Sequence, residues 1–159
     1  MAMQRVAVVD YGGSNLRSVV KAVEHVAGRG FEVVVAERPE QLRAADRVVF
    51  PGQGAIGDCM KHLRERDLID VLRESVRVKP FFGICLGLQS LMTTSDEDGG
   101  MACLDVYAGG VRRFAADAGP APDGSPRKIP HMGWNEVHWT RPHPVTDGVP
   151  SGTRFYFVH

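Results

Sequence analysis

The sequence predicts a three-layer α/β fold, in which helices cover both faces of a mainly parallel sheet. Three observations lead to this prediction. Four short apolar runs recur within the first 84 residues, and continuous apolar runs are typical of strands buried on both faces. Segments with helical periodicity separate these runs, as in units that join parallel strands. Polar and glycine-rich turns follow the runs, where α/β proteins keep their functional sites.

The first predicted strand covers residues 6–10 and ends at Asp10. After the turn at residues 11–13, apolar residues recur at helical spacing, which predicts a helix with one apolar face. Ser14 is a suitable N-cap for this helix, and Gly28 and Gly30 end it. The turn contains two glycines, but neither glycine pattern of the common phosphate-binding loops is present. The sequence therefore gives little support to nucleotide binding there.

Residues 31–35 and 47–50 are the second and third predicted strands, with a short helix at residues 39–45 between them. The loop at residues 51–54 follows the third strand directly. Its glycines, Gly52 and Gly54, allow the backbone to approach a ligand and turn its N–H groups towards it. An ordinary turn remains the alternative for this loop.

Residues 56–78 have helical periodicity with a break near Asp67, and residues 81–84 are the fourth predicted strand. Cys85 follows this strand, with Gly83 two positions before it and Gly87 two positions after it. This is the pattern of a nucleophile elbow, a sharp turn between a strand and a helix that exposes the side chain at the turn.

The chemistry of an elbow fits a reactive thiol. The N-terminus of the following helix favours the thiolate, and the N–H of Leu86 is free to stabilise a developing oxyanion. A buried structural cysteine is the alternative for Cys85, and it is our prediction for Cys59 and Cys103, which lack the flanking glycines. The helix after Cys85 is predicted to turn Leu88, Leu91 and Met92 inward. Gln89 is one helical turn after Cys85 and is therefore predicted to lie on the same side as the thiol. An exposed glutamine that only favours the helix is the alternative.

The pattern changes after Ser95, and an antiparallel extension is predicted from about residue 100. Strand-like pieces occur at residues 104–107, 109–114, 136–139 and 155–158, and residues 115–127 form an exposed loop. Residues 129–135 are predicted to be a loop that carries Met132, Trp134 and Asn135, a combination that suits recognition. A Trp134 side chain that caps the core is the alternative.

Composition limits the choice of function. With 159 residues and 43% hydrophobic content, the chain suits a single globular domain covering residues 1–159. The formal net charge is zero, so no overall basic field favours a nucleic acid or an anionic membrane as partner. No apolar run is long enough to span a membrane. Three cysteines do not make a disulfide framework, which indicates a cytoplasmic protein. The histidines show no metal-ligand spacing, and neither a metal nor a cofactor is predicted.

Taken together, these motifs resemble the class I (triad) glutamine amidotransferases, and within that class the glutaminase subunits of imidazole glycerol phosphate synthases. The resemblance spans the whole chain and implies the flavodoxin-like arrangement of that class. Ser14 departs mildly, because the family more often has glycine there. The segments that match the family are Asp10-Tyr11-Gly12, Asn15-Leu16, Pro51-Gly52-Gln53-Gly54, Gly83-Ile84-Cys85-Leu86-Gly87-Leu88-Gln89, Pro130-His131-Met132-Gly133-Trp134-Asn135 and Phe155-Tyr156-Phe157-Val158-His159.

The resemblance implies a role for each matching residue. Cys85 is the nucleophile that forms a thioester with the side chain of glutamine and releases ammonia. Leu86, Gln53 and Gly54 supply the oxyanion donors. Gly52, Gly54 and Gln89 contact the glutamine. The partner is a cyclase subunit with a (β/α)₈ barrel, in a heterodimer, and the residues expected to face it are Asn15, Met132, Trp134 and Asn135.

One part of the family pattern is not found in these 159 residues. The family's base and its orienting acid lie in a His-x-Glu motif, which does not occur in the sequence. His159 resembles a different histidine of the family. We therefore expect the chain to lack a C-terminal part of the domain. We also expect it to have little activity alone, because a cysteine without a base is mostly protonated at neutral pH. Two alternatives remain: a non-catalytic fragment that binds the partner, and another cysteine hydrolase with the same elbow.

Overall fold

The computed structural model describes residues 3–13, 15–115, 119, 124 and 129–158. It divides into two compact units, Met1–Arg113 and Phe114–His159, which are described separately below. The single domain predicted for residues 1–159 stays a prediction. The N-cap role predicted for Ser14, most of the loop at residues 115–127, and His159 lie outside the described residues.

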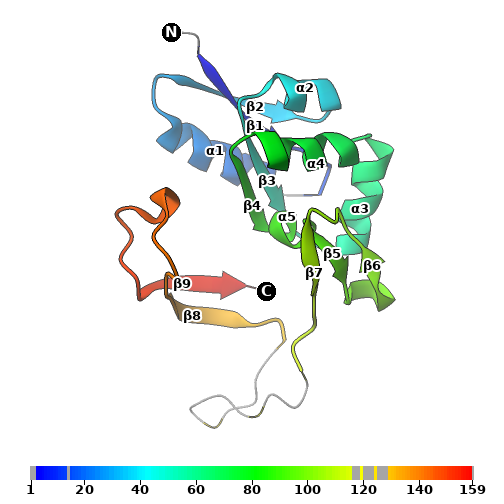
Figure 1. The fold of residues 1–159 in the computed structure, drawn as a ribbon, viewed down its shortest axis with the longest axis vertical. Coiled ribbons are helices and arrows are strands. Elements are labelled where there is room, and N and C mark those ends of the chain that lie inside the picture. The colour runs from blue at the N-terminus through cyan, green and yellow to red at the C-terminus, as the bar shows by residue number, and fades with distance from the viewer. Residues whose placement is uncertain (1–2, 14, 116–118, 120–123, 125–128, 159) are drawn as a thin grey trace. The chain divides into compact units, whose positions relative to one another are not determined.

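The first unit is built around a four-stranded parallel sheet, as predicted (Figure 1). Its strands are β1 (Gln4–Val9), β2 (Phe31–Ala36), β3 (Arg47–Gly52) and β4 (Phe81–Cys85), in the spatial order β2-β1-β3-β4. The chain moves outward in one direction from β1 to β2 and in the other from β3 to β4. The switch between these two directions lies at the carboxyl ends of β1 and β3, the usual place for a ligand in such sheets.

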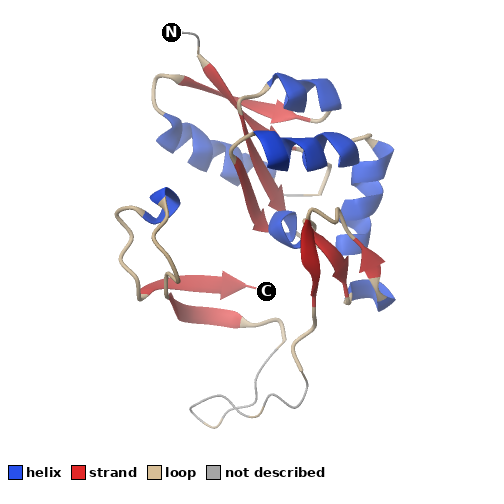
Figure 2. Ribbon diagram, in the orientation of Figure 1, coloured by secondary structure: helices blue, strands red, loops and turns tan. Residues whose placement is uncertain are grey.

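Helices cover both faces of this sheet, which confirms the three-layer architecture (Figure 2). Helix α1 (Leu16–Ala27) packs its apolar side against Val6, Val8 and Val49. The opposite face carries α2 (Pro39–Ala44), α3 (Ile56–Glu65) and α4 (Ile69–Val78). The predicted break near Asp67 is confirmed, since Asp67 has a left-handed backbone with φ of 56° between α3 and α4.

The helix after Cys85 is shorter than predicted. Helix α5 covers only Leu86–Gln89, and β5 (Met92–Ser95) begins three residues later. The hydroxyl of Ser90 donates to the carbonyl of Gly87, which closes the turn, and two β-branched threonines then favour a strand. The prediction was right for Leu91, which is buried, but wrong for Leu88, which is 48% exposed, and Met92 belongs to the strand.

A second sheet in this unit has the order β6-β5-β7, with β6 at Met101–Ala102 and β7 at Tyr107–Val111. A 3-10 turn, η1 (Glu97–Gly99), joins β5 to β6. Strands β5 and β6 are antiparallel, as expected for the extension, but β5 and β7 are parallel. The strand predicted at residues 104–107 begins only at Tyr107, because Asp105 has a φ of 52° that interrupts an extended chain.

The second unit contains an antiparallel pair of strands, β8 (Met132–Val137) and β9 (Thr153–Val158), and a short 3-10 turn, η2 (Pro144–Thr146). The residues predicted to form a loop at 132–135 lie in β8 instead. Their partners in β9 explain the difference, since Met132 pairs with Val158 and Trp134 with Tyr156. Strand partners 22 and 26 residues away in sequence override the local loop signals of Pro130 and Gly133.

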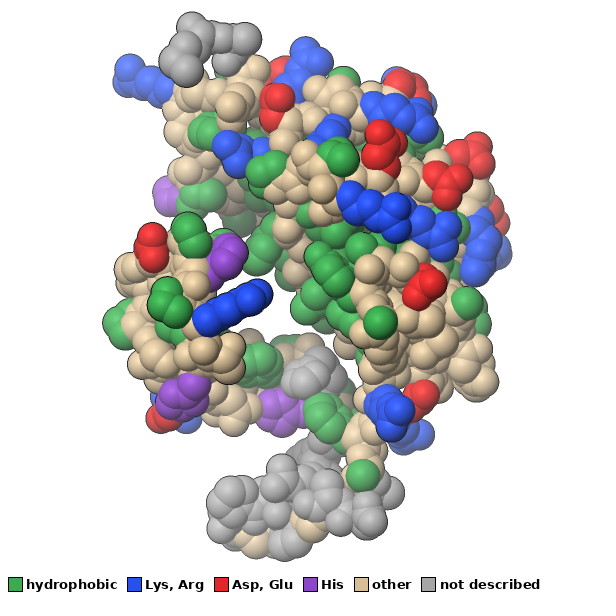
Figure 3. Space-filling model, in the orientation of Figure 1, with side chains coloured by type: hydrophobic (Ala, Val, Ile, Leu, Met, Phe, Trp, Pro, Cys, Tyr) green, Lys and Arg blue, Asp and Glu red, His purple; other side chains and the backbone are tan. Residues whose placement is uncertain are grey.

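In the described part of the chain, we find no helix with the length and apolar character needed to cross a membrane. Acidic and basic side chains are interspersed over the surface in Figure 3, in keeping with a net charge of zero.

Candidate active site

Cys85 lies at the junction predicted for a nucleophile. It ends β4, occupies the N-cap position of α5 and is exposed. Its backbone has φ of 53° and ψ of −118°, a conformation that costs a residue with a side chain about 1–3 kcal/mol. The strained turn between strand and helix is the geometry of an elbow. Because α5 is a single turn, the N–H groups nearest the thiol matter more than a long helix dipole.

Glycines allow the chain segments around Cys85 to approach one another. A Cβ on Gly87 would overlap the carbonyl oxygen of Phe50 in β3, and a Cβ on Gly83 would lie 3.0 Å from the Cα of Leu88. A Cβ on Gly52 would lie 2.7 Å from the backbone nitrogen of Gly87. Close contact between β3, β4 and α5 therefore requires glycine at positions 52 and 87 and leaves little room for a side chain at position 83.

The loop after β3 lies beside the thiol. Gly52 is the register partner of Cys85 across the β3–β4 pair, and Gly54 has a φ of 89° that favours glycine. Leu86 is buried as the first residue of α5. The elbow and the loop are thus brought together, while the oxyanion roles of Leu86, Gln53 and Gly54 and the substrate contacts of Gly52, Gly54 and Gln89 stay predictions. Gln89 is half-buried at the end of α5.

Tyr11 is a residue at this site to which the sequence patterns assign no role. It follows β1, is 1% exposed and packs edge-to-face on Phe50 with 5.9 Å between ring centroids. The backbone N–H of Gln53 donates to the Tyr11 hydroxyl over 3.3 Å, and that hydroxyl lies 3.5 Å from the carbonyl oxygen of Gln53. Burial, with the nearby Cys59 thiol, raises the pKa of Tyr11 to about 12. A tyrosine buried after a strand end was the available signal, since its hydroxyl needs a partner.

Glu97 makes a second long-range contact that the sequence patterns did not reveal. Its carboxylate accepts the N–H of Ile56 over 2.8 Å, at the start of α3, where Ala55 provides no side-chain cap. A carboxylate at this position satisfies a free N–H of the helix and interacts favourably with the helix dipole. Glu97 therefore fixes the far end of the loop that begins at Gly52.

The three cysteines differ in solvent exposure as predicted. Cys59 and Cys103 are buried, and Cys85 is exposed. Burial raises the pKa of Cys59 to about 12 and also raises the pKa of Cys103. Both buried thiols therefore remain protonated at neutral pH and are poor nucleophiles, which leaves Cys85 as the accessible thiol of the chain.

The residues predicted to face a partner lie in different units. Asn15 precedes α1 in the first unit. Met132 and Trp134, 59% and 60% exposed, lie in β8 of the second unit. Asn135 follows them, and its side-chain nitrogen lies 3.1 Å from Nε2 of His131. Their partner role stays a prediction.

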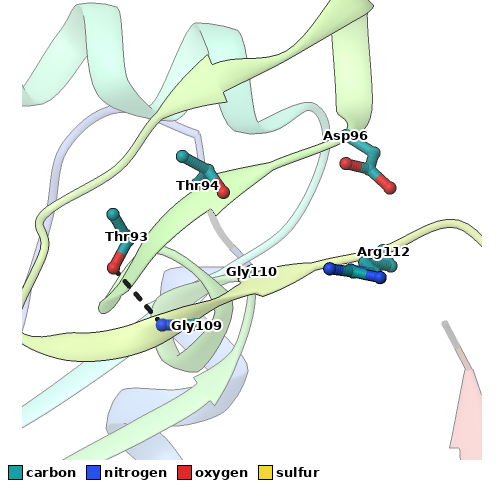
Figure 4. A pocket seen from close by; sticks show the side chains of 6 residues that line it. All are labelled: Thr93, Thr94, Asp96, Gly109, Gly110 and Arg112. Carbon is teal, nitrogen blue, oxygen red and sulfur yellow. Dashed lines mark hydrogen bonds between the residues drawn. The ribbon is translucent and has the colours of Figure 1, made fainter.

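A polar depression of about 590 Å³ lies between β5 and β7, separate from Cys85 (Figure 4). The hydroxyl of Thr93 accepts the N–H of Gly109 across it over 3.3 Å. Its lining residues are Thr93, Thr94, Asp96, Gly109, Gly110 and Arg112. No group of three or more His, Cys, Asp or Glu side chains that could hold a metal ion occurs among the described residues.

Comparisons with known proteins identify the family of the chain. The family model described as glutamine amidotransferase class-I matches residues 7–159. The chain is 50% identical to the imidazole glycerol phosphate synthase subunit HisH of Nitrosococcus oceani over 157 residues, which cover 99% of this chain and 72% of the relative. It is 51% identical to the subunit of the same name from Dechloromonas aromatica, covering 100% of this chain and 73% of the relative.

A solved structure described as a glutamine amidotransferase superposes with a TM-score of 0.66 at 18% identity, covering 96% of this chain and 70% of that one. At this identity the superposition supports the fold, whereas the sequence matches support the family. The chain belongs to the class I glutamine amidotransferases.

Proposed function

We propose that the chain is the glutaminase part of an imidazole glycerol phosphate synthase, which hydrolyses glutamine to glutamate and supplies ammonia to a cyclase subunit. The exposed Cys85 in a strained elbow beside the Gly52–Gly54 loop carries this proposal. Relatives that are about half identical over nearly the whole chain, and whose names give this subunit, support the choice of substrate and pathway.

The reaction proceeds in two steps. The Cys85 sulfur attacks the side-chain carbonyl carbon of glutamine, the C–N bond breaks, and the nitrogen leaves as ammonia after taking up a proton. Water then attacks the thioester carbon, which gives glutamate and restores the thiol. Each step passes through an oxyanion, for which the N–H of Leu86 and the loop after β3 are the proposed donors. Loss of one such donor typically lowers turnover about 10²–10³-fold.

Proton transfer limits what this chain does alone. The first step needs a base for the thiol and an acid for the leaving nitrogen. The resemblance assigns both tasks to a His-x-Glu motif, which the 159 residues do not contain. We therefore expect little ammonia release from this chain in isolation, even with Cys85 correctly placed.

The second unit is the proposed surface for the cyclase subunit, a (β/α)₈ barrel. Met132, Trp134 and Tyr156 are each more than half exposed, and Trp134 packs edge-to-face on Tyr156 across the strand pair. Exposed aromatic side chains of this kind are common anchors in protein interfaces. Asn15 in the first unit is the remaining predicted contact.

The substrate is tested by alkylation of Cys85 with a diazoketone analogue of glutamine, followed by intact-mass measurement. We expect a single adduct that free glutamine suppresses and that Cys85→Ser abolishes. Glutamate at the same concentration is the matched control ligand. An adduct that glutamine does not suppress would instead favour a different cysteine hydrolase with the same elbow.

A non-catalytic fragment that binds the cyclase is the second candidate, and the exposed Trp134 favours it. Retention of the chain on an immobilised cyclase subunit, together with the absence of glutamine-protected labelling, would support binding without catalysis. Failure to bind the cyclase subunit would count against it.

A further inference from the structure

The polar depression between β5 and β7 is lined on the β7 side by backbone without side chains. Gly109 and Gly110 supply this stretch, and both are exposed. Gly110 pairs with Thr94 of β5, and a Cβ on Gly110 would lie 3.0 Å from the Thr94 hydroxyl oxygen. Two consecutive glycines therefore leave open a space that side chains would fill. Its volume of about 590 Å³ is within the range of about 300–1,000 Å³ that is usual for small-molecule sites.

Two side chains of opposite charge lie at one end of this depression. Asp96 directly follows β5 and Arg112 directly follows β7, and the N–H of Asp96 donates to the carbonyl of Val111 over 2.9 Å. The preceding residues, Ser95 and Val111, are register partners, and Ser95 is buried. Because side chains alternate along a strand, Asp96 and Arg112 turn to the open face, where both line the depression (Figure 4).

Neither of these charged side chains has a partner in the described part of the chain. The ion pairs found there include neither Asp96 nor Arg112, and neither side chain forms a hydrogen bond with a described residue. Arg38 and Glu40 are also well exposed, yet their side chains meet over 2.7 Å. The gap between Asp96 and Arg112 suits a ligand that carries both charges, because a simple anion is repelled by Asp96 and a simple cation by Arg112.

The two threonines of the depression have different tasks. The Thr93 hydroxyl accepts the N–H of Gly109 over 3.3 Å and lies 3.4 Å from the carbonyl oxygen of Tyr107, so it ties β5 to β7. The exposed Thr94 hydroxyl forms no hydrogen bond with a described residue. A guanidinium and a hydroxyl suit the two oxygens of a carboxylate, and the Asp96 carboxylate suits an ammonium group. An α-amino acid carries both groups on one carbon atom.

We propose that this depression binds a free α-amino acid, with its carboxylate on Arg112 and Thr94 and its ammonium group on Asp96. The side chain of the amino acid then has the open space beside Gly109 and Gly110. None of these residues belongs to the proposed glutaminase site. The inference therefore goes beyond that function and does not depend on it.

The test is a titration of the isotope-labelled 159-residue chain with glycine, followed by NMR. Glycine is the probe because it presents the two charged groups and no side chain. Acetate and methylammonium, which each carry one of these groups, are the matched control ligands. We expect saturable shifts of the Thr94 and Gly110 amides with glycine. Each control ligand should bind about 10-fold or more weakly, because it lacks one charge-assisted contact.

Two variants assign the charged contacts. Arg112→Gln should weaken glycine binding about 10-fold or more. Arg113→Gln, at the next arginine, which does not line the depression, is the matched control and should leave it unchanged. Asp96→Asn should weaken glycine binding and at the same time strengthen acetate binding, because it removes the repulsion beside Arg112. Damage to the fold would not produce these opposite changes.

Four results would overturn the inference: no saturable shift with glycine, shifts at Gly52 and Gly54 in place of Thr94 and Gly110, acetate binding as tight as glycine binding, or an equal loss in Arg113→Gln. If Arg112→Gln does not fold, Asp96→Asn and the two control ligands decide. The proposed glutaminase function is tested separately by the glutamine-protected labelling of Cys85, so either proposal can fail while the other stands.

Discussion

The two faces of the four-stranded sheet differ in how deeply they are packed. On the face covered by α2, α3 and α4, one continuous cluster of buried side chains includes Phe50, Leu63 and Leu72, all inaccessible to solvent. On the face covered by α1, the described residues that are buried are Val6, Val8 and Val49, and α1 itself contributes no buried residue. Stability should therefore depend mainly on the first face, to which Tyr11 and Leu86 also belong.

The largest effect is expected where the elbow contacts this well-packed face. Gly87→Ala would force a Cβ into the carbonyl oxygen of Phe50, and backbone cannot move aside as a side chain can. We expect a loss of about 4 kcal/mol or more in the free energy of unfolding, measured by urea denaturation. Gly30→Ala, where nothing lies within 4 Å of the new Cβ, should change it by less than about 0.5 kcal/mol. Equal urea midpoints for the two variants would show that the elbow relaxes freely.

A matched pair of valines compares the faces directly. Val71 in α4 is 1% exposed within the large cluster, and Val20 in α1 is only partly buried. Val71→Ala should lower the free energy of unfolding by about 2 kcal/mol, and Val20→Ala by less than about 1 kcal/mol. The measurement is again urea denaturation. A larger loss for Val20→Ala would reverse the comparison.

The last effect is absent at neutral pH and appears only in alkaline solution. Burial raises the pKa values of Tyr11 and Cys59, both on the well-packed face, to about 12. Both groups bind their protons more tightly when folded, so their contribution is complete below the unfolded pKa values of about 9–10 and is lost as pH rises towards 12. Thermal denaturation should show a melting temperature that falls over this range. Cys59→Ala should weaken that fall, and an identical pH profile in this variant would exclude Cys59 as a cause.

The difference between the faces also explains what the sequence could predict. The four parallel strands are continuous apolar runs, and the elbow combines such a run with two glycines, so both were predictable from local patterns. Burial of Cys59 and Cys103 followed from the residue type together with the absence of flanking glycines.

The remaining features depend on contacts between distant residues. Tyr11 reaches Gln53, 42 positions away, and Glu97 reaches Ile56, 41 positions away, through hydrogen bonds that leave no periodic trace in sequence. Trp134 lies in a strand because Tyr156 pairs with it. Helix α5 ends early because the chain turns at Ser90, where the apolar pattern alone suggested that the helix continues.

The paired strands of the sheet are far apart in sequence, and this affects when the elbow at Cys85 forms during folding. Val6 pairs with Arg47, and Val48 pairs with Phe81, so the strand pairings beside the elbow close long loops, and pairings of this kind slow folding. On the ribosome, the thiol of Cys85 emerges as that of an unstructured peptide. It acquires its strained geometry only after β1, β3 and β4 have come together, so the nascent chain carries an ordinary cysteine until its fold is complete.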